Sequence, residues 1–565
     1  MWWLLVSTLL ISVGSSSSED NLVVDTDKGK VQGVTLKSAT GKDVDAWLGI
    51  PFAKPPTGNL RFKLPQPPEK WDDTKQATRQ PNSCVQTIDT TFGDFPGSNM
   101  WNANTDLSED CLYLNVIVPK PRPTSNNKAP VMLYIFGGGF YCGSATLDVY
   151  DPKTLASEEN VIVVSIQHRV ASLGFLYLGT EEAPGNMGLF DQRMAMKWVK
   201  DNIQNFGGDP NKITLFGMSS GASSIGLHLM APESHSLFNN AILESGTAFT
   251  PWTLMSKEEN KKRGLDLAKQ MKCTKNDNQH DMNCLRTANA TQMVYKEWEM
   301  ETKPSGVYEF PFVPVVDSQQ PFFKKGESSG DNKFKKTGVI MGSNKEEGIY
   351  FLLYFLKDVL KKEEQTTVNE EQYKDAVEKI YPYLTEDNRK QIKDKYKTWQ
   401  GADKSNDYKD ALDKMVGDSN TTCSVNQFAD VYAGLQQDVY VYLFDRISNV
   451  SPWPKWTGGM HGEEIYYVFG EPLNTTKGYS EEDKKLSKEM MKYWANFART
   501  GDPNKDDKNQ KTTVTWPKYD TTQKKYLKLA EKLEEGSKHR EEQCQFWKTL
   551  GQHVSTNELD TSTSK

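Results

Sequence analysis

Residues 217–221 have the sequence Gly-Met-Ser-Ser-Gly, which places Ser219 in a Gly-x-Ser-x-Gly motif. A β-rich run, 213–216, precedes the motif, and a helical pattern, 222–230, follows it. Between a strand and a helix, this motif is typical of a sharp, strained turn that projects the serine hydroxyl as a nucleophile. Glycine suits both ends of that turn because it brings no side chain where neighbouring chains approach. Ser219 is therefore the candidate for nucleophilic catalysis.

A glycine-rich segment, Gly-Gly-Gly-Phe at residues 137–140, is the second motif with chemical meaning, and it follows the β-rich run 131–136. A serine that attacks a carbonyl group needs donors for the oxyanion that forms. Residues without side chains let backbone N–H groups point at that oxygen. An ordinary flexible loop is the alternative. Together the two motifs indicate acyl transfer through a serine.

Both motifs need a scaffold that holds strand ends close together. The β-rich runs are 131–136, 161–166 and 213–216, and the last of them follows Gly-Gly-Asp-Pro at 207–210, which predicts a stop and a turn. Helical patterns cover 187–205, 358–400 and 482–500. Such alternation of strands and helices predicts a mostly parallel sheet with helices on both faces.

The domain organisation follows from what interrupts the chain. We find no internal repeat and no linker between about residues 22 and 550, so we expect one domain over 19–550 and a flexible polar tail at 551–565. Residues 1–18 are apolar and then Ser-rich, which predicts a signal peptide, with a buried N-terminal helix as the alternative. No later run reaches the roughly 20 apolar residues of a membrane span. We therefore expect a secreted, extracellular protein without a membrane anchor.

Composition restricts the function further. The net charge of -7 over 565 residues argues against nucleic-acid binding. Seven cysteines in an exported chain predict three disulfides and one free thiol, and the spacing alone leaves the pairing open. Four Asn-x-Ser/Thr triplets are candidate glycosylation sites, at Asn289, Asn420, Asn449 and Asn474.

Several longer segments carry a family resemblance. They are Ser-Glu-Asp-Cys-Leu-Tyr-Leu-Asn at 108–115, residues 137–143 with Leu-Asp-Val-Tyr-Asp at 147–151, Glu-Ala-Pro-Gly-Asn at 182–186, and Phe-Gly-Gly-Asp-Pro at 206–210. Over about residues 21 to 550 the chain resembles the cholinesterase branch of the type-B carboxylesterases. The resemblance implies an α/β-hydrolase fold. It also implies a serine esterase that hydrolyses acetylcholine to choline and acetate through an acyl-enzyme, with no cofactor and no metal.

The resemblance also supplies an acid and a base. Residues 342–348, Gly-Ser-Asn-Lys-Glu-Glu-Gly, resemble the segment with the family's catalytic glutamate and indicate Glu347, with Glu346 beside it expected to be solvated. A surface glutamate is the alternative for Glu347. His461, in Gly-Met-His-Gly-Glu-Glu at 459–464, resembles the catalytic histidine. The order Ser219, Glu347, His461 is the order that this fold requires.

The same resemblance implies the remaining roles. The aromatic residues among them suit a quaternary ammonium group, which is attracted to aromatic faces and best to indole. The implied oxyanion hole is formed by Gly138, Gly139 and Ser220. The implied choline site is Trp101 and Tyr350, with core packing as the alternative for Trp101. The implied rim is Asp89, Tyr141, Trp298 and Tyr354. The implied acyl pocket, which suits acetyl better than butyryl groups, is Trp252, Tyr308, Phe310 and Phe351. The implied disulfides join Cys84 to Cys111, Cys273 to Cys284, and Cys423 to Cys544.

Four residues depart from the family pattern. Met218 stands where the family typically has Glu, which predicts an enzyme that is slower or less selective for choline. Cys142 replaces a Ser and is the expected free thiol, Ser220 replaces an Ala, and Thr87 replaces a rim Tyr, which predicts weaker binding at the rim. No cysteine follows Cys544, so we expect no inter-subunit disulfide and a monomer or weak homodimer.

Two other functions stay open at this point. A broad-specificity carboxylesterase for uncharged esters would keep the three catalytic residues but would not need Trp101, Asp89 and Tyr350 together. A non-catalytic adhesion or ligand-sequestering relative usually lacks part of the catalytic set. Rates on choline and phenyl esters separate the first alternative, and covalent labelling by an organophosphate separates the second.

Overall fold

The computed structural model describes residues 22–275, 280–303, 306–316, 322, 334–363, 366–397 and 407–551. The expected signal peptide at 1–18 and nearly all of the expected tail at 551–565 lie outside the described residues.

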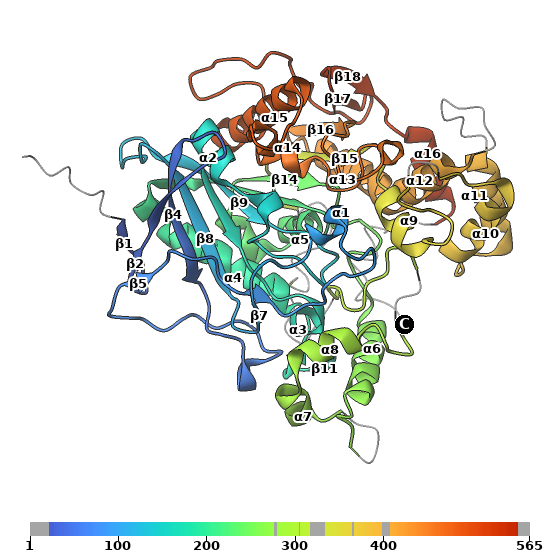
Figure 1. The fold of residues 1–565 in the computed structure, drawn as a ribbon, viewed down its shortest axis with the longest axis horizontal. Coiled ribbons are helices and arrows are strands. Elements are labelled where there is room, and N and C mark those ends of the chain that lie inside the picture. The colour runs from blue at the N-terminus through green and yellow to red at the C-terminus, as the bar shows by residue number, and fades with distance from the viewer. Residues whose placement is uncertain are drawn as a thin grey trace, which may run out of the picture.

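An eleven-stranded sheet forms the centre of the protein (Figure 1). In spatial order its strands are β18 (Glu534–Ser537), β17 (Lys525–Leu529), β16 (Val439–Phe444), β15 (Val339–Asn344), β14 (Asn240–Glu244), β13 (Gly208–Met218), β9 (Ala129–Ile135), β10 (Ile162–Ile166), β8 (Tyr113–Pro119), β4 (Asp43–Pro51) and β3 (Val34–Lys37). The pairings from β17 through to β10 are parallel, and the strands outside them are antiparallel. The prediction of a mostly parallel sheet is confirmed.

Helices cover both faces of this sheet (Figure 1). Helices α2 (Lys153–Glu159) and α15 (Glu481–Thr500) pack together on one face, and α4 (Met187–Asn202) and α5 (Ser220–Leu229) pack on the other. The central strands β9 and β16 are buried along their whole length, as expected for parallel strands between two helical layers. The carboxyl ends of these strands therefore meet at one protected edge.

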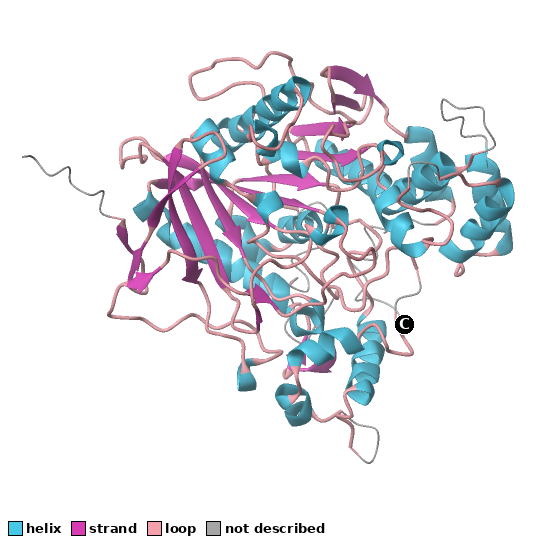
Figure 2. Cartoon of the chain, in the orientation of Figure 1, coloured by secondary structure: helices cyan, strands magenta, loops and turns pink. Residues whose placement is uncertain are grey.

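The remaining elements decorate this core. The other helices are α1 (Pro96–Asn99), α3 (Ala171–Phe175), α6 (Lys257–Gln270), α7 (Met282–Thr287), α8 (Ala290–Lys296), α9 (Ile349–Phe355), α10 (Glu370–Ile380), α11 (Glu386–Lys397), α12 (Lys409–Gly417), α13 (Cys423–Gly434), α14 (Ile465–Val468) and α16 (Glu541–Thr549). The smaller sheets contain β1 (Val23–Asp25) with β2 (Lys30–Gln32) and β5 (Lys75–Gln76), β6 (Ser83–Cys84) with β7 (Leu107–Ser108), and β11 (Tyr177–Thr180) with β12 (Ala183–Pro184). Figure 2 shows α10, α11 and α12 at one side of the molecule, and strands β4 and β8 lie toward the opposite side.

Three predicted elements differ in their boundaries. The charged pattern at 358–400 forms two helices, α10 and α11, with Pro382 in the break between them, where a proline cannot continue a helix. The helical pattern at 187–205 ends as an α-helix at Asn202 and continues as a short 3-10 turn. In the predicted turn at 207–210, Gly207 ends the 3-10 turn with φ 91°, whereas Gly208 to Pro210 form the start of β13, whose pairing with β9 shifts register before Ile213.

Three disulfides tie the outer segments to the core. They join Cys84 to Cys111, Cys273 to Cys284, and Cys423 to Cys544, and Cys142 is a free thiol. The last bond connects α13 to α16 across 121 residues of sequence. Because a crosslink over a long segment removes many conformations from the unfolded chain, this bond is expected to contribute most of the three.

We expect the double variant Cys423→Ser, Cys544→Ser to be about 3 to 5 kcal/mol less stable than the wild type, since the unfolded chain regains that freedom. Urea unfolding followed by tryptophan fluorescence measures the difference. Cys142→Ser, which breaks no disulfide, is the matched control and should unfold at nearly the wild-type urea concentration. Equal midpoints for the double variant and this control would contradict the prediction.

Candidate active site

Ser219 occupies a strained turn at the carboxyl edge of the sheet. It lies between β13 and α5 with φ 57° and ψ -125°, a conformation that residues with side chains rarely adopt. The flanking glycines make the turn possible, because a Cβ atom at Gly217 or Gly221 would lie 2.4 or 2.0 Å from the backbone oxygen of Ile135. The Ser219 N–H donates to the Glu244 carbonyl on β14 at 2.8 Å. The sheet therefore fixes the direction of the Ser219 side chain.

A buried acid–base pair lies at the same edge. Glu347 follows β15, and its Oε2 atom is 2.5 Å from Nδ1 of His461. The other oxygen, Oε1, accepts the Asn344 N–H at 2.7 Å. The side chains of Glu347 and His461 are 1% and 5% exposed, so water competes little for this contact. Since Glu347 accepts from Nδ1, the free lone pair of the neutral imidazole is at Nε2.

The Nε2 atom of His461 is buried and has no hydrogen-bond partner among the described residues. His461 and Ser219 both line one cavity of about 80 Å³. Its walls are Trp101, Gly137, Gly138, Gly139, Tyr141, Cys142, Gly143, Leu147, Tyr150, Met218, Ser219, Phe310, Tyr350, Phe351 and His461. The candidate nucleophile Ser219, the base His461 with its unpaired Nε2 atom, and the glycine loop therefore line the same cavity.

The glycine loop leaves no room for side chains. Gly138 and Gly139 have φ angles of 125° and 57°, and a Cβ atom would lie 2.3 Å from the Cys142 carbonyl oxygen or 2.7 Å from the Phe310 ring. Neither glycine N–H donates a hydrogen bond to another described residue, and neither does the N–H of Ser220. At the first turn of α5, the Ser220 N–H has no acceptor within the helix. These three donors are free to bind an oxyanion.

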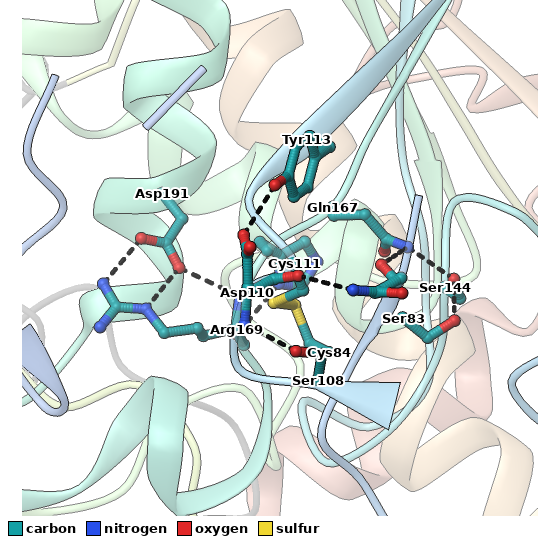
Figure 3. The surroundings of a disulfide bond; sticks show 12 residues. Ser83, Cys84, Ser108, Asp110, Cys111, Tyr113, Ser144, Gln167, Arg169 and Asp191 are labelled. Carbon is teal, nitrogen blue, oxygen red and sulfur yellow. Dashed lines mark hydrogen bonds and ion pairs between the residues drawn. A yellow bond between two sulfur atoms is a disulfide. The ribbon is translucent and has the colours of Figure 1, made fainter. Parts of the chain in front are cut away.

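The loop that carries Trp101 is tied to this glycine loop. Figure 3 shows the Cys84–Cys111 disulfide that closes it, with Ser83 and Gln167 both bonded to Ser144. Gln86 adds a two-way bridge, because its amide donates to the Gly143 carbonyl and accepts the Gly143 N–H, both at 2.8 Å. The tryptophan loop and the oxyanion loop are therefore joined by several buried hydrogen bonds.

Trp101 and Tyr350, the two residues of the expected choline site, line the same cavity. The Trp101 ring lies 6.1 Å from that of Tyr150. Met218 is next to it, because a Cβ atom on Gly462 would be 3.3 Å from both the Trp101 ring and the Met218 methyl group. The cavity wall beside the Trp101 indole therefore carries the neutral thioether side chain of Met218.

The four rim residues are joined in two pairs. The Tyr354 hydroxyl donates to Asp89 at 2.6 Å, and the Tyr350 hydroxyl is 3.2 Å from that of Tyr354. Tyr141 packs edge to face on Trp298 at 5.2 Å, and Trp298 is 36% exposed. Of these four residues, Tyr141 alone also lines the cavity, and Tyr354 reaches it through the hydroxyl of Tyr350.

The expected acyl-pocket residues form two layers. Phe310 and Phe351 line the cavity, and Phe351 lies 5.0 Å from the His461 ring. Tyr308 and Trp252 pack behind them, with ring distances of 3.9 Å from Tyr308 to Phe351 and 5.7 Å from Trp252 to Phe310. Tyr308 also donates its hydroxyl to the Glu347 carbonyl at 2.9 Å. Tyr308 therefore supports the acid as well as the pocket.

Two findings at this site were not anticipated. The expectation that Glu346 is solvated is wrong, since its side chain is 16% exposed and accepts the Gly459 N–H at 2.9 Å. Burial raises the pKa of this carboxyl to about 7. The sequence indicated no role for Tyr150, yet this residue lines the cavity beside Trp101. Its place in the segment 147–151 was the only feature of the sequence that pointed to it.

The Cys142 thiol is expected to be unreactive although it lies in the cavity wall. Burial raises the pKa of its thiol to about 12, and the sulfur donates to the Gly138 carbonyl at 3.4 Å. A protonated thiol is a poor nucleophile. Ser219 is therefore the nucleophile candidate that the cavity favours.

Comparison with known proteins shows the family to which the chain belongs. The family model described as "Carboxylesterase family" matches residues 20–547. The chain belongs to the carboxylesterase family. This carboxylesterase is 41% identical to the acetylcholinesterase of Bungarus fasciatus over 555 residues, which cover 97% of this chain and 89% of the relative. It is also 41% identical to the cholinesterase of Mus musculus over 548 residues, with 97% and 89% covered, and to acetylcholinesterase 1 of Caenorhabditis elegans over 538 residues, with 91% and 86% covered.

The α/β-hydrolase fold and the family together identify the protein as a serine carboxylic-ester hydrolase that acts on a small-molecule ester. Within the described residues, no helix has both the length and the apolar character needed to cross a membrane.

We expect Glu347→Gln to lower kcat by about three orders of magnitude, because an amide cannot stabilise the imidazolium or hold the correct tautomer. Glu346→Gln is the matched control, since it removes the adjacent carboxylate but keeps an acceptor for the Gly459 N–H. Its kcat should stay within about threefold of the wild type. Steady-state hydrolysis of phenyl acetate measures both. Equal losses in the two variants would overturn the assignment of the acid.

Proposed function

We propose that this esterase hydrolyses choline esters, with acetylcholine as the preferred substrate, through an acyl-enzyme on Ser219. The observation that carries the proposal is the 2.5 Å contact between His461 Nδ1 and Glu347, which leaves Nε2 open in the cavity that Ser219 and Trp101 line. An ester with a cationic alcohol fits this combination of a general base and an indole face.

In the proposed reaction, His461 Nε2 takes the Ser219 hydroxyl proton while the oxygen attacks the ester carbonyl carbon. The N–H groups of Gly138, Gly139 and Ser220 bind the resulting oxyanion. When the intermediate collapses, His461 protonates the departing alcohol. Water then attacks the acyl-enzyme with His461 again as the base, which releases the acid and restores Ser219. Every proton transfer uses groups of the chain, so the scheme needs no cofactor.

The aromatic rings of the cavity favour a substrate whose alcohol group is cationic. Trp101 and Tyr350 offer ring faces inside the cavity, and a desolvated cation on an indole gains up to about 2 kcal/mol. The Asp89 carboxylate accepts the Tyr354 hydroxyl, which is in turn 3.2 Å from the hydroxyl of the cavity residue Tyr350. We propose that this rim first attracts the cation and that the indole then holds it beside His461.

The acyl group is the second determinant of specificity. Phe310 and Phe351 narrow the cavity beside the glycine loop, with Tyr308 and Trp252 filling the space behind them. We propose that these rings accept an acetyl group and disfavour longer chains. Selectivity should be graded, since each methylene changes binding by about 1 to 3 kcal/mol.

We further propose that the protein is secreted. Its three disulfides persist in oxidising compartments, and the expected signal peptide agrees with export. Asn289 is exposed and suits glycosylation, whereas the exposed Asn449 and the half-buried Asn420 donate their side-chain amides to the Gly478 and Val416 carbonyls. Asn474 is also half-buried.

One domain over 19–550 and a monomer or weak homodimer stay predictions.

Hydrolysis of acetyl-, propionyl- and butyrylcholine and of phenyl acetate by the purified protein tests the function. Titration with an organophosphate counts the active sites. We expect stoichiometric labelling and the highest kcat/KM on acetylcholine. Hydrolysis of phenyl acetate alone would favour the broad carboxylesterase, which Met218 beside the indole makes the second candidate. Absence of labelling would exclude the proposed chemistry.

We expect Met218→Glu to raise the preference for acetylcholine over its uncharged isostere 3,3-dimethylbutyl acetate by about tenfold, because a carboxylate would then face the bound cation in a partly dry site. The ratio of the two kcat/KM values measures this preference. Met218→Gln has the same length and no charge, so its ratio should stay near that of the wild type. Unchanged ratios in both variants would contradict the electrostatic role of this position.

We expect Phe310→Leu to raise the ratio of butyrylcholine to acetylcholine hydrolysis by about tenfold, since a smaller side chain leaves space for two further methylene groups. Phe312→Leu is the control, because Phe312 is fully buried and is not one of the residues that line the cavity. Both kcat/KM values are normalised to the organophosphate titre. A similar ratio in the two variants would place acyl selection elsewhere.

A further inference from the structure

Glu347 also borders a second cavity, which the mechanism above does not use. This cavity has a volume of about 310 Å³, and Lys414 on α12 lies in its wall together with Glu347. The Lys414 side chain is only 13% exposed. A lysine that is buried to this degree costs free energy unless its ammonium group is paired and hydrogen-bonded, so Lys414 requires a physical explanation.

The ammonium group of Lys414 has three acceptors. It donates to the Lys345 carbonyl at 2.5 Å and to Asp413 Oδ2 at 2.8 Å, and it is 3.5 Å from Glu346 Oε1. Lys345 and Glu346 directly precede Glu347 in the chain, whereas Asp413 is the neighbour of Lys414 on α12. One side chain therefore joins α12 to the turn that carries the candidate acid.

Asp413 continues this connection to the end of the turn. Its Oδ1 atom accepts the N–H groups of Gly348 and Ile349 at 2.8 and 2.9 Å. Because Lys414 holds the other oxygen, Oδ2, the Asp413 carboxylate is bonded at both of its oxygens. The acid-bearing turn, residues 345–349, is therefore bonded to α12 both before and after the candidate acid.

The backbone of α12 also lies directly against the acid-bearing turn. A Cβ atom at Gly348 would be 2.4 Å from the Asp413 carbonyl oxygen, and a Cβ atom at Gly417 would be 3.1 Å from that of Glu347. Glycine at both positions permits this close approach. Since no space separates the two segments, a shift of α12 displaces the Glu347 side chain.

The acid-bearing turn is bonded in turn to the loop that carries His461. Glu346 donates its N–H to the Gly459 carbonyl at 3.3 Å, and its Oε2 atom accepts the Gly459 N–H at 2.9 Å. The Glu346 carboxylate therefore faces Lys414 with one oxygen and the histidine loop with the other. The contact between Glu347 and His461 depends on these two loops keeping their places.

The carboxylates around Lys414 keep it charged. Burial alone would lower the pKa of its ammonium group, but Asp413 and Glu346, with Asp418, raise this pKa above its usual range. The other charged or titratable side chains that face this group across the second cavity are Lys345, Asp445, Tyr526, Lys528, His539 and Arg540. Lys414 is therefore an ammonium ion throughout the neutral pH range.

We propose that Lys414 is a positioning residue for ester hydrolysis, whose ammonium group holds the acid-bearing turn against α12 and so keeps Glu347 in hydrogen-bond contact with His461. This inference rests on the proposed function. Lys414 does not line the candidate active-site cavity, so it acts only through the turn. The requirement is strict, because a displacement of about 1 Å at a catalytic group can lower a rate by about a hundredfold.

Three variants separate this role from general stabilisation. Lys414→Met removes the ammonium group at similar length, whereas Lys414→Arg keeps a cation with several donors for the same acceptors. Lys409→Met is the matched control. Lys409 lies on the same helix and is 16% exposed, but it pairs with Asp407 and not with the acid-bearing turn.

Steady-state hydrolysis of phenyl acetate, normalised to the organophosphate titre, is the first measurement. We expect Lys414→Met to lower kcat by about tenfold to a hundredfold with KM nearly unchanged, since the cavity that binds the substrate is intact. Lys414→Arg should stay within about threefold of the wild type. Lys409→Met should match the wild type.

A double-mutant cycle shows whether Lys414 acts through the acid. In a Glu347→Gln background, Lys414→Met should lower kcat by less than about twofold further, because the carboxylate that it positions is already gone. A merely structural role would give losses that multiply in the double variant. Such independent losses, or a wild-type kcat in the single variant Lys414→Met, would overturn the proposal.

Proton NMR is the last measurement and needs no substrate. We expect a far-downfield signal from the proton between His461 Nδ1 and Glu347, kept in Lys414→Arg and Lys409→Met but shifted or lost in Lys414→Met. An unchanged signal in Lys414→Met overturns the proposal. If this variant does not fold, the shorter, uncharged Lys414→Gln replaces it in every measurement. A protein that hydrolyses no ester but loses the signal would contradict the proposed function and leave the role of Lys414 in placing Glu347 established.

Discussion

The hydrogen bond between His461 and Glu347 requires two buried side chains, 114 residues apart in the chain, to meet at 2.5 Å. Neither partner lies inside a strand or helix, so the rest of the structure must hold the two loops. The sheet does this at its carboxyl edge, where β15 delivers Glu347 and β13 delivers Ser219. Asn344, the last residue of β15, bonds both to Glu347 and to the Met460 carbonyl at 2.6 Å, so one side chain and its backbone fix the acid and the histidine loop together.

Hydrogen bonds and a disulfide, rather than the sheet, hold the oxyanion loop and the tryptophan loop. Long loops carry many buried polar groups, and each needs a partner. Here Gln86, Gln167 and Ser144 supply these partners beside the Cys84–Cys111 disulfide (Figure 3). The Trp101 loop and the oxyanion loop are consequently joined by hydrogen bonds. Under the proposed function, a cation held on the Trp101 indole keeps the carbonyl group of the same substrate near the oxyanion donors. This coupling turns binding energy at a distant group into positioning at the reacting carbon.

The sequence was most informative where local chemistry is decisive. Glycine positions around Ser219 and in the 137–139 loop predict turns that only those residues can form, and the β/α alternation predicts the parallel sheet. Environment was harder to predict, because it depends on contacts between distant segments. Glu346 looked solvated, yet the Gly459 loop covers it. The helical pattern at 358–400 indicated helical character correctly but did not place the break at Pro382.

Met218 and Glu244 stand side by side on neighbouring strands, and they differ in charge and in surroundings. They are partners in the register of β13 and β14, so their side chains emerge on the same face of the sheet. The family pattern has a carboxylate at the first of these positions, where it would face the substrate cation. In this chain the carboxyl group lies on the neighbouring strand, under Trp494 and outside the described cavity wall. Under the proposed function, recognition of the cation is therefore left to the aromatic faces of Trp101 and Tyr350.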